Sequence, residues 1–209
     1  IIKKCAAKTN FSQKKLSKKI SDAIIFACDD ILNNPEKYSD EFPIPIFQTG
    51  SGTQTNMNVN EVIANKANEK LGGRLGKYEY LHPNDHVNMS QSTNDTFPTA
   101  TLIGTVLAVE DNLIPALKML SASLNKKTKK FKKIIKVGRT HLQDATPITL
   151  GQEFSGFESM ISNDLKRIEL AMKECTDLPI GGTAVGTGLN TLDGYDDLMA
   201  SFISEETGI

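Results

Sequence analysis

The sequence predicts an all-α protein, in which an N-terminal helical domain precedes the first part of a long-helix central bundle. Apolar residues recur at spacings of three and four along most of the chain, and prolines or glycines separate these stretches. Only residues 44–47 and 134–137 have the composition of strands. Shorter, loop-rich segments give way to long helical ones near Ser92, so we expect domains at residues 1–91 and 92–209.

The first expected helices are of moderate length. The chain already has a helical pattern at Ile1 and lacks an initiator Met, so we expect a missing N-terminal piece. A clear apolar stripe then runs over residues 16–31, and Pro35 follows its end. Residues 40–49 are expected to be extended or looped, because Pro43 and Pro45 disfavour helix at the residues before them.

A further helix is expected to begin within residues 56–60 and to stop at Gly72 and Gly73. Its start would directly follow the Gly-Ser-Gly-Thr loop at residues 50–53. Free backbone N–H groups and a partial positive charge at a helix N-terminus favour a bound carboxylate.

The second half of the chain predicts longer helices. One runs over residues 99–124, capped by Asp95 or Thr96, and Pro115 is expected to kink or split it. Apolar residues at 150–172 recur almost as in a coiled-coil seam, and a helix of that length spans about 35 Å. These dimensions suit a long bundle.

Composition and charge argue against nucleic acid and membranes as partners. The formal net charge of −1 provides no bulk positive field for nucleic acid or an anionic membrane surface. No apolar run approaches the about 18 residues of a membrane helix, so we expect no membrane partner. The odd number of cysteines, Cys5, Cys28 and Cys175, without a CxxC pair favours reduced thiols in an intracellular compartment. The cytoplasm is the predicted location, with the mitochondrial matrix as the alternative.

Three polar segments carry the chemistry: GSGTQTNMN at 50–58, HPNDHVNMSQSTND at 82–95 and GRTHLQD at 138–144. Their hydroxyl and amide side chains suit a small, oxygen-rich anion better than a metal or a nucleotide. His141 is the candidate general acid or base, with Arg139 and Asp144 as possible orienting partners. A purely structural histidine is the alternative.

Other motifs have simpler interpretations. His82 and His86 have a zinc-ligand spacing, but Pro83 interrupts a helix there and no HExxH pattern occurs, so no metal is predicted. The run at residues 92–95 also suits a helix start, which is itself an anion site. The glycine-rich segment 181–188 lacks a phosphate-loop ending and predicts a tight turn or close helix packing.

Four longer motifs occur in order along the chain: GSGTQTNMNVNEVIAN at 50–65, HPNDHVNMSQSTNDTFPTA at 82–100, GRTHLQDATPITLGQEF at 138–154 and GGTAVGTGLNT at 181–191. In these motifs the chain resembles class II fumarase of the aspartase/fumarase superfamily. Aspartases are similar in the STND segment but typically carry Gln in place of His141 and a different loop in place of residues 51–54. The resemblance therefore favours fumarase over an aspartate ammonia-lyase or another superfamily lyase. A non-catalytic structural protein of the same fold is the more distant alternative.

The resemblance implies reversible hydration of fumarate to L-malate without a cofactor, in a homotetramer whose active sites each collect segments from three chains. It implies His141 as the proton donor or acceptor. The implied substrate-binding residues are Ser51, Gly52, Thr53, Ser92, Thr93, Asn94 and Thr140. A second, non-catalytic dicarboxylate site is implied at His82, Pro83, Asn84 and Asp85, although Glu79 stands where the family often has a basic residue.

The family's GSSxMPxKxNP loop supplies a catalytic serine and two further site residues, and it does not occur in these 209 residues. We therefore expect the sequence to be a fragment of a longer enzyme and to be inactive alone.

Overall fold

The computed structural model describes residues 1–45, 47 and 51–209, and these form a mainly helical structure with one two-stranded sheet in the described part. The all-α prediction is confirmed. The chain divides into two compact units, Ile1–Leu102 with Leu178–Ile209, and Ile103–Asp177. The expected domain boundary after residue 91 stays a prediction, but the grouping of the last 32 residues with the N-terminal ones was not foreseen.

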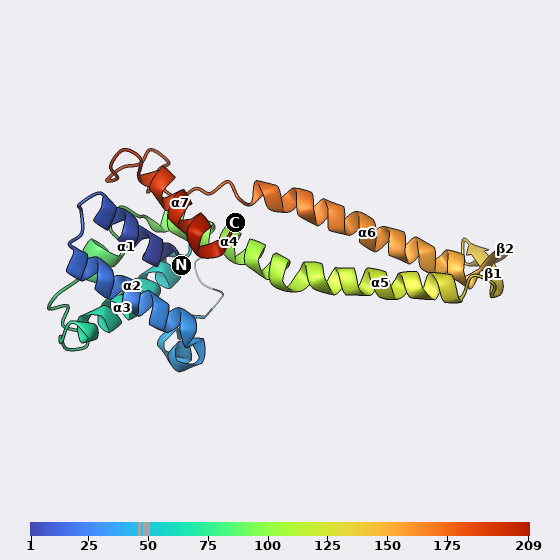
Figure 1. Ribbon diagram of the computed structural model, residues 1–209, viewed down its shortest axis with the longest axis horizontal. Helices are drawn as coiled ribbons and strands as arrows, with labels where there is room; N and C mark the ends of the chain where they lie inside the picture. Colours follow the sequence, from blue (N-terminus) through green and yellow to red (C-terminus); the bar gives the residue numbers. More distant parts are fainter. Residues whose placement is uncertain (46, 48–50) are drawn as a thin grey trace. The chain divides into compact units, whose positions relative to one another are not determined.

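The first unit is a cluster of helices (Figure 1). These helices pack around small side chains. α1 packs against both α2 and α7, and α2 packs against α3. Alanines from α1, α2 and α3 are fully or almost fully buried in its core and allow close approach of the helix backbones. The elements of this unit are α1 (Ile2–Ser12), α2 (Lys18–Asn33), η1 (Pro35–Glu41), α3 (Thr53–Lys70), η2 (Pro83–Val87), the start of α4 (Thr93–Ala108) and α7 (Tyr195–Thr207).

α2 confirms the helix predicted over residues 16–31, and Ser17 caps it by accepting a hydrogen bond from the Ile20 N–H. α3 corrects the expected start within residues 56–60, because the helix begins at Thr53, directly after Gly52. Its predicted stop is confirmed, since the Gly73 N–H binds the Asn68 carbonyl at 2.8 Å.

The expected loop over residues 40–49 is partly wrong, because η1 extends to Glu41. Residues 42–45 are neither helix nor strand, and residue 47 is a bend. The strand suggested at 44–47 is therefore not formed by its described residues. Ile46, Gln48, Thr49 and Gly50 lie outside the described residues.

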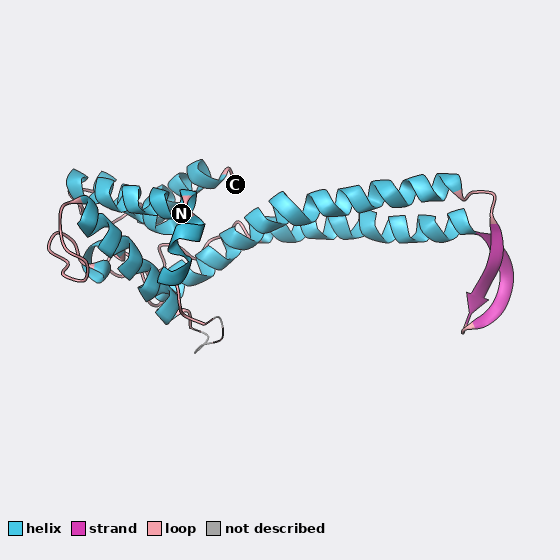
Figure 2. Ribbon diagram, turned by 90° about the horizontal axis from the view of Figure 1, so that it is seen from below, coloured by secondary structure: helices cyan, strands magenta, loops and turns pink. Residues whose placement is uncertain are grey.

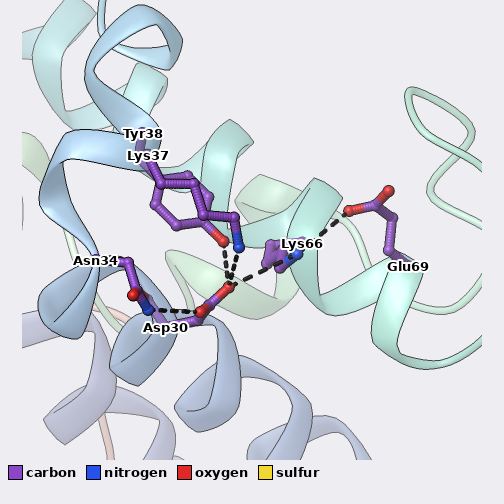
Figure 3. Close-up of polar contacts among 6 residues, drawn as sticks. All are labelled: Asp30, Asn34, Lys37, Tyr38, Lys66 and Glu69. Carbon is purple, nitrogen blue, oxygen red and sulfur yellow. Dashed lines mark hydrogen bonds and ion pairs between the residues drawn. The ribbon is translucent and has the colours of Figure 1, made fainter.

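Asp30 on α2 ties η1 and α3 to that helix (Figure 3). Its carboxylate accepts a hydrogen bond from the Tyr38 hydroxyl and lies 3.1 Å from Lys37 Nζ and 3.6 Å from Lys66 Nζ. The Tyr38 hydrogen bond, followed by that from Lys37, lowers the pKa of Asp30 from 3.8 to about 2.

We expect Asp30→Asn to lower stability at neutral pH and to flatten its acid dependence. Because the folded-state pKa lies below the unfolded value, the stabilisation is present above about pH 4 and is lost as the pH falls towards about 2. Denaturant unfolding between these pH values measures the difference between parent and variant. Asp22→Asn, which removes an exposed pair with Lys18 on the same helix, is the control. If the unfolding free energies of the parent and of Asp30→Asn changed equally with pH, the stabilising role of the Asp30 carboxylate would be contradicted.

The second unit consists of a long helical pair and a hairpin (Figures 1 and 2). α5 and α6 pack together, and the Ser121 hydroxyl donates to Glu158 at 2.9 Å across the pair. The rings of Phe131 and Phe154 lie 5.5 Å apart near the hairpin end of the pair. The elements are the end of α4, η3 (Val109–Leu113), α5 (Ile114–Lys130), β1 (Ile135–Thr140), β2 (Gln143–Thr149) and α6 (Leu150–Glu174).

Pro115 was expected to kink or split the helix; the structure shows a local change of helix type within the continuous helical stretch Thr93–Lys130. A π-helical turn, η3, separates α4 from α5 directly before this proline, which cannot donate a backbone hydrogen bond. α6 confirms the helix predicted over residues 150–172, and Thr149 and Gln152 form a capping box at its start.

The hairpin corrects the expectation that only residues 134–137 have strand character here. β1 pairs antiparallel with β2 in the register Ile135 with Thr149 and Thr140 with Gln143. Gly138 permits the close approach of the strands, because a Cβ there would lie 2.6 Å from the Thr146 carbonyl oxygen. Polar residues and Pro147 in β2 concealed the strand pattern.

The continuous helical stretch Thr93–Lys130 is long and apolar enough to cross a membrane by length and composition alone. This corrects the expectation that no stretch approaches that criterion. Only 11% of its most apolar window is buried within this chain. Along the α5–α6 pair, Met119 is 70% exposed and Met160 63% exposed. These apolar side chains are not covered by the rest of the described chain.

Candidate active site

The first site segment lies at the N-terminus of α3, in the first unit. Gly52 has φ +74°, and a Cβ there would lie 2.3 Å from the Phe97 ring of α4. Glycine is therefore required both by the backbone conformation and by the close approach. The hydroxyls of Ser51 and Thr53 lie 3.2 Å apart on either side of it. The first loop thus lies against α4.

The second site segment is the N-terminus of α4. The helix begins at Thr93, not at residue 99, and Ser92 rather than Asp95 or Thr96 provides the capping oxygen. The Asn94 N–H binds Ser92 Oγ at 3.3 Å, and the Ser92 N–H binds Asp95 Oδ1 at 2.9 Å. This reciprocal arrangement fixes the segment that carries Ser92, Thr93 and Asn94.

Asp95 joins this segment to the glycine-rich segment near the end of the chain. Asp95 is only 2% exposed, and the two oxygens of its carboxylate have different partners. Oδ1 binds the Ser92 N–H, while Oδ2 accepts the N–H groups of Gly181 at 3.1 Å and Thr183 at 2.9 Å. Asn94 Nδ2 also donates to the Ala184 carbonyl at 2.7 Å. The glycine-rich segment therefore forms a tight turn held by α4.

Amide side chains join the first segment to the second. Asn56 Nδ2 donates to Thr93 Oγ1 at 2.9 Å and to Asn88 Oδ1 at 3.3 Å. Lys3 Nζ donates to Asn88 Oδ1 at 2.8 Å and to Gln91 Oε1 at 3.0 Å. Sequence reasoning did not assign Lys3, Asn56, Asn88 or Gln91 to the site. Their polar type within the motifs was visible, but Lys3 carried no signal because it lies in an ordinary helical pattern.

The predicted second-site residues lie in and before η2. The His82 N–H donates to His86 Nδ1 at 2.9 Å, and the Asn84 N–H donates to His82 Nδ1 at 3.2 Å. Asp85 lies 3.5 Å from His82 Nδ1. Pro83 is buried at the first position of the turn. Their role as a dicarboxylate site stays a prediction, as does the absence of a metal. Among the described residues, no three His, Cys, Asp or Glu side chains group as metal ligands.

Glu79, which precedes this turn, forms an ion pair with Arg74, in which Oε1 of Glu79 lies 2.9 Å from Nη2 of Arg74. Close in sequence to the predicted second site, this chain thus has a carboxylate at the position where the resemblance leads us to expect a cation.

Thr140 and His141 belong to the second unit and lie at the tip of the hairpin. His141 and Leu142 have φ values of +49° and +62°, as the commonest two-residue hairpin turn requires. The turn exposes both residues, and Leu142 is 94% exposed. Arg139 and Asp144, the possible orienting partners of His141, instead lie 3.4 Å from each other across the strands.

Within one chain, the structure therefore brings together the predicted residues of the 51–53 loop and the α4 N-terminus. The predicted roles of these residues in catalysis or substrate binding stay predictions.

This chain belongs to the lyase family, because the family model described as Lyase matches residues 1–209. Within that family it is similar to class II fumarate hydratases. It is 50% identical to "Fumarate hydratase class II" of Neisseria meningitidis, over 100% of this chain and 45% of the relative. It is 52% identical to "Fumarate hydratase, mitochondrial" of Saccharomyces cerevisiae, over 100% of this chain and 42% of the relative.

The fold matches a crystal structure of recombinant class II fumarase from Schistosoma mansoni, with a TM-score of 0.94 and 43% identity. That match covers 99% of this chain and 43% of the solved chain. The chain thus spans less than half the length of these relatives.

Proposed function

We propose that this sequence is part of a fumarate hydratase that interconverts fumarate and L-malate. Its similarity over the full chain to proteins of that name supports the proposal. The observation that carries it within the structure is the meeting of two hydroxyl-bearing helix N-termini, at Thr53 of α3 and Thr93 of α4. Backbone N–H groups and the positive ends of two helix dipoles favour a carboxylate-bearing ligand there.

The chemistry requires stabilisation of a carbanion next to a carboxylate. When a base removes a proton from carbon three of malate, negative charge spreads into the neighbouring carboxylate, where preorganised N–H and hydroxyl donors stabilise it. Ser51, Thr53, Ser92, Thr93, Asn94 and Thr140 are the proposed donors. His141 is the proposed acid that protonates the departing hydroxide. No cofactor is required by this chemistry.

The proposal is tested with the complete enzyme, meaning the protein in which this sequence continues into the remainder of the family's length. Fumarate consumption is measured in water alone and in the presence of ammonia, and the products are identified. Malate formation in both conditions supports a hydratase. Aspartate as the main product would support the ammonia-lyase alternative, and no conversion of fumarate would contradict both.

We further infer that copies of this chain cover the exposed apolar residues of α5 and α6 in a homotetramer. The exposed side chains of Met119, Met160 and Leu170 line these helices. Glu110 and Asp111, in the turn between α4 and α5, would be costly inside a lipid bilayer. Protein partners therefore suit this stretch better than a membrane.

We expect Met160→Glu to weaken this assembly, because it places a charge within an apolar contact. Sedimentation of the complete enzyme should shift from tetramer towards smaller species, at least at micromolar concentration. Lys166→Glu, an exposed charged position on the same helix, is the control. A parent enzyme that sediments as a monomer would contradict the inference. The compartment stays a prediction, namely the cytoplasm or alternatively the mitochondrial matrix.

A further inference from the structure

Lys3 is a buried lysine that forms no ion pair with a carboxylate in the part of the chain that the structure describes. It lies in the first turn of α1 and is only 5% exposed, whereas buried lysines are rare unless paired with an opposite charge. Its Nζ instead donates to the side-chain oxygens of Asn88 and Gln91. Burial lowers the pKa of Lys3 to about 7, although Asp95 acts in the opposite direction. An apolar side chain at this position would avoid that desolvation.

Two neighbouring lysines on the same helix behave differently. Lys4 Nζ lies 2.8 Å from Asp29 and 2.7 Å from Glu206, and Lys8 also binds Glu206. These ion pairs join α1 to α2 and α7. Lys3 differs because its contacts lead into the segment that begins α4.

The hydrogen bonds of Lys3 determine how Asn88 is oriented. The ammonium form of a lysine has three N–H donors and no acceptor, and here it donates to the two amide oxygens at 2.8 and 3.0 Å. The Asn88 oxygen must therefore face Lys3, which places its Nδ2 3.3 Å from the Gln91 carbonyl oxygen. If the Asn88 amide were flipped, its NH₂ group would face the N–H groups of Lys3, and two sets of donors would point at each other.

The same constraint extends to Thr93. Because the Asn88 oxygen also faces Asn56, the Asn56 group directed at it must be Nδ2, at 3.3 Å. That nitrogen uses its other hydrogen for Thr93 Oγ1 at 2.9 Å. Since the Thr93 oxygen accepts from Asn56, the proton of its hydroxyl is left to be donated elsewhere.

We propose that Lys3 is a positioning residue that sets the direction of the hydrogen bonds through Asn88 and Asn56, so that the Thr93 hydroxyl donates its proton to a substrate carboxylate. The inference rests on the proposed function, in which Thr93 binds a dicarboxylate. Removal of Lys3 allows the Asn88 and Asn56 amides to flip, and Thr93 then donates to Asn56 instead of to the ligand. Lys3 itself touches no substrate.

The test is a double-mutant cycle in the complete enzyme, with KM for fumarate and the dissociation constant of succinate as measurements. Succinate is a dicarboxylate that cannot be hydrated, so it reports binding without catalysis. Thr93→Val should raise both constants by about 10- to 100-fold, the loss of one hydrogen bond to a charged group, and Lys3→Met should raise them by about tenfold. On the Thr93→Val background, Lys3→Met should add less than about twofold, because both changes remove the same interaction.

Lys4→Met is the matched control, since it should lower stability through lost ion pairs and leave both constants within about twofold of the parent. Asn56→Asp provides a second test that leaves Lys3 in place, because a carboxylate keeps the shape but cannot donate to Thr93. It should weaken succinate binding like Lys3→Met.

Additive effects of Lys3→Met and Thr93→Val in an active parent would overturn this inference alone. The inference is also overturned if Lys4→Met raises KM and the succinate dissociation constant as much as Lys3→Met does. If Lys3→Met fails to fold, normal succinate binding by Asn56→Asp overturns it instead. A parent that binds no dicarboxylate overturns this inference and the proposed function together.

Discussion

His141→Asn in the complete enzyme is expected to lower kcat by about 10²- to 10⁴-fold, the usual contribution of a positioned acid or base. Asparagine retains a polar side chain and tolerates the left-handed backbone that His141 adopts at φ +49°. The hairpin turn should therefore persist while proton transfer is lost. Steady-state kinetics should show a fall in kcat with a comparatively small change in KM.

His82→Asn is the control for this prediction, because it alters only the proposed second site and should leave kcat within a few-fold of the parent. The structure supports treating the two histidines separately, since His82 is held by hydrogen bonds within η2 whereas His141 is exposed at a hairpin tip. If His82→Asn were severely impaired and His141→Asn nearly normal, the two assignments would have to be exchanged.

Among the substitutions proposed, Asp95→Asn is expected to cause the largest loss of stability. The unfolding free energy should fall by about 3–5 kcal/mol, which is the usual effect of removing one charged partner from a buried network. The carboxylate uses one oxygen for the Ser92 N–H and the other for Gly181 and Thr183. An amide offers only one oxygen, so its NH₂ group must face backbone N–H donors on one side. Either the α4 cap or the glycine-rich turn then loses its acceptor.

Denaturant unfolding of the complete enzyme, followed by circular dichroism, measures this loss. KM for fumarate should rise as well, because Ser92, Thr93 and Asn94 are positioned by the same cap. Asp197→Asn, an exposed acidic residue in the first turn of α7, should change the unfolding free energy by less than about 1 kcal/mol. Equal stability of Asp95→Asn and Asp197→Asn would show that Asp95 is not required to hold the two segments together.

Helices with a sustained apolar period could be predicted well, because each residue of such a helix interacts with neighbours three and four positions away. α2, α6 and the interruption before Pro115 are examples. Helix starts were less predictable. Residues 53–56 and 93–98 are polar or carry a proline, so they lack the apolar period that indicated the rest of α3 and α4.

The candidate substrate-binding residues were named through the resemblance of their motifs to the fumarase family, and the polar setting of His141 by itself indicated a candidate acid or base. The motifs did not predict that His141 lies in a two-residue turn, because β1 and β2 are recognisable mainly through their pairing. They also gave no reason to connect Asp95 with Gly181, or Lys3 with Asn88, which are 86 and 85 residues apart.

Local periodicity in the sequence was therefore sufficient for most of the helix content, whereas the type of ligand and the residues that would bind it stay predictions. The partners of each buried polar group depended on the folded chain. A buried N–H, carboxylate or ammonium must find a partner wherever the packing places one, and residues close in sequence do not reveal which distant segment that is.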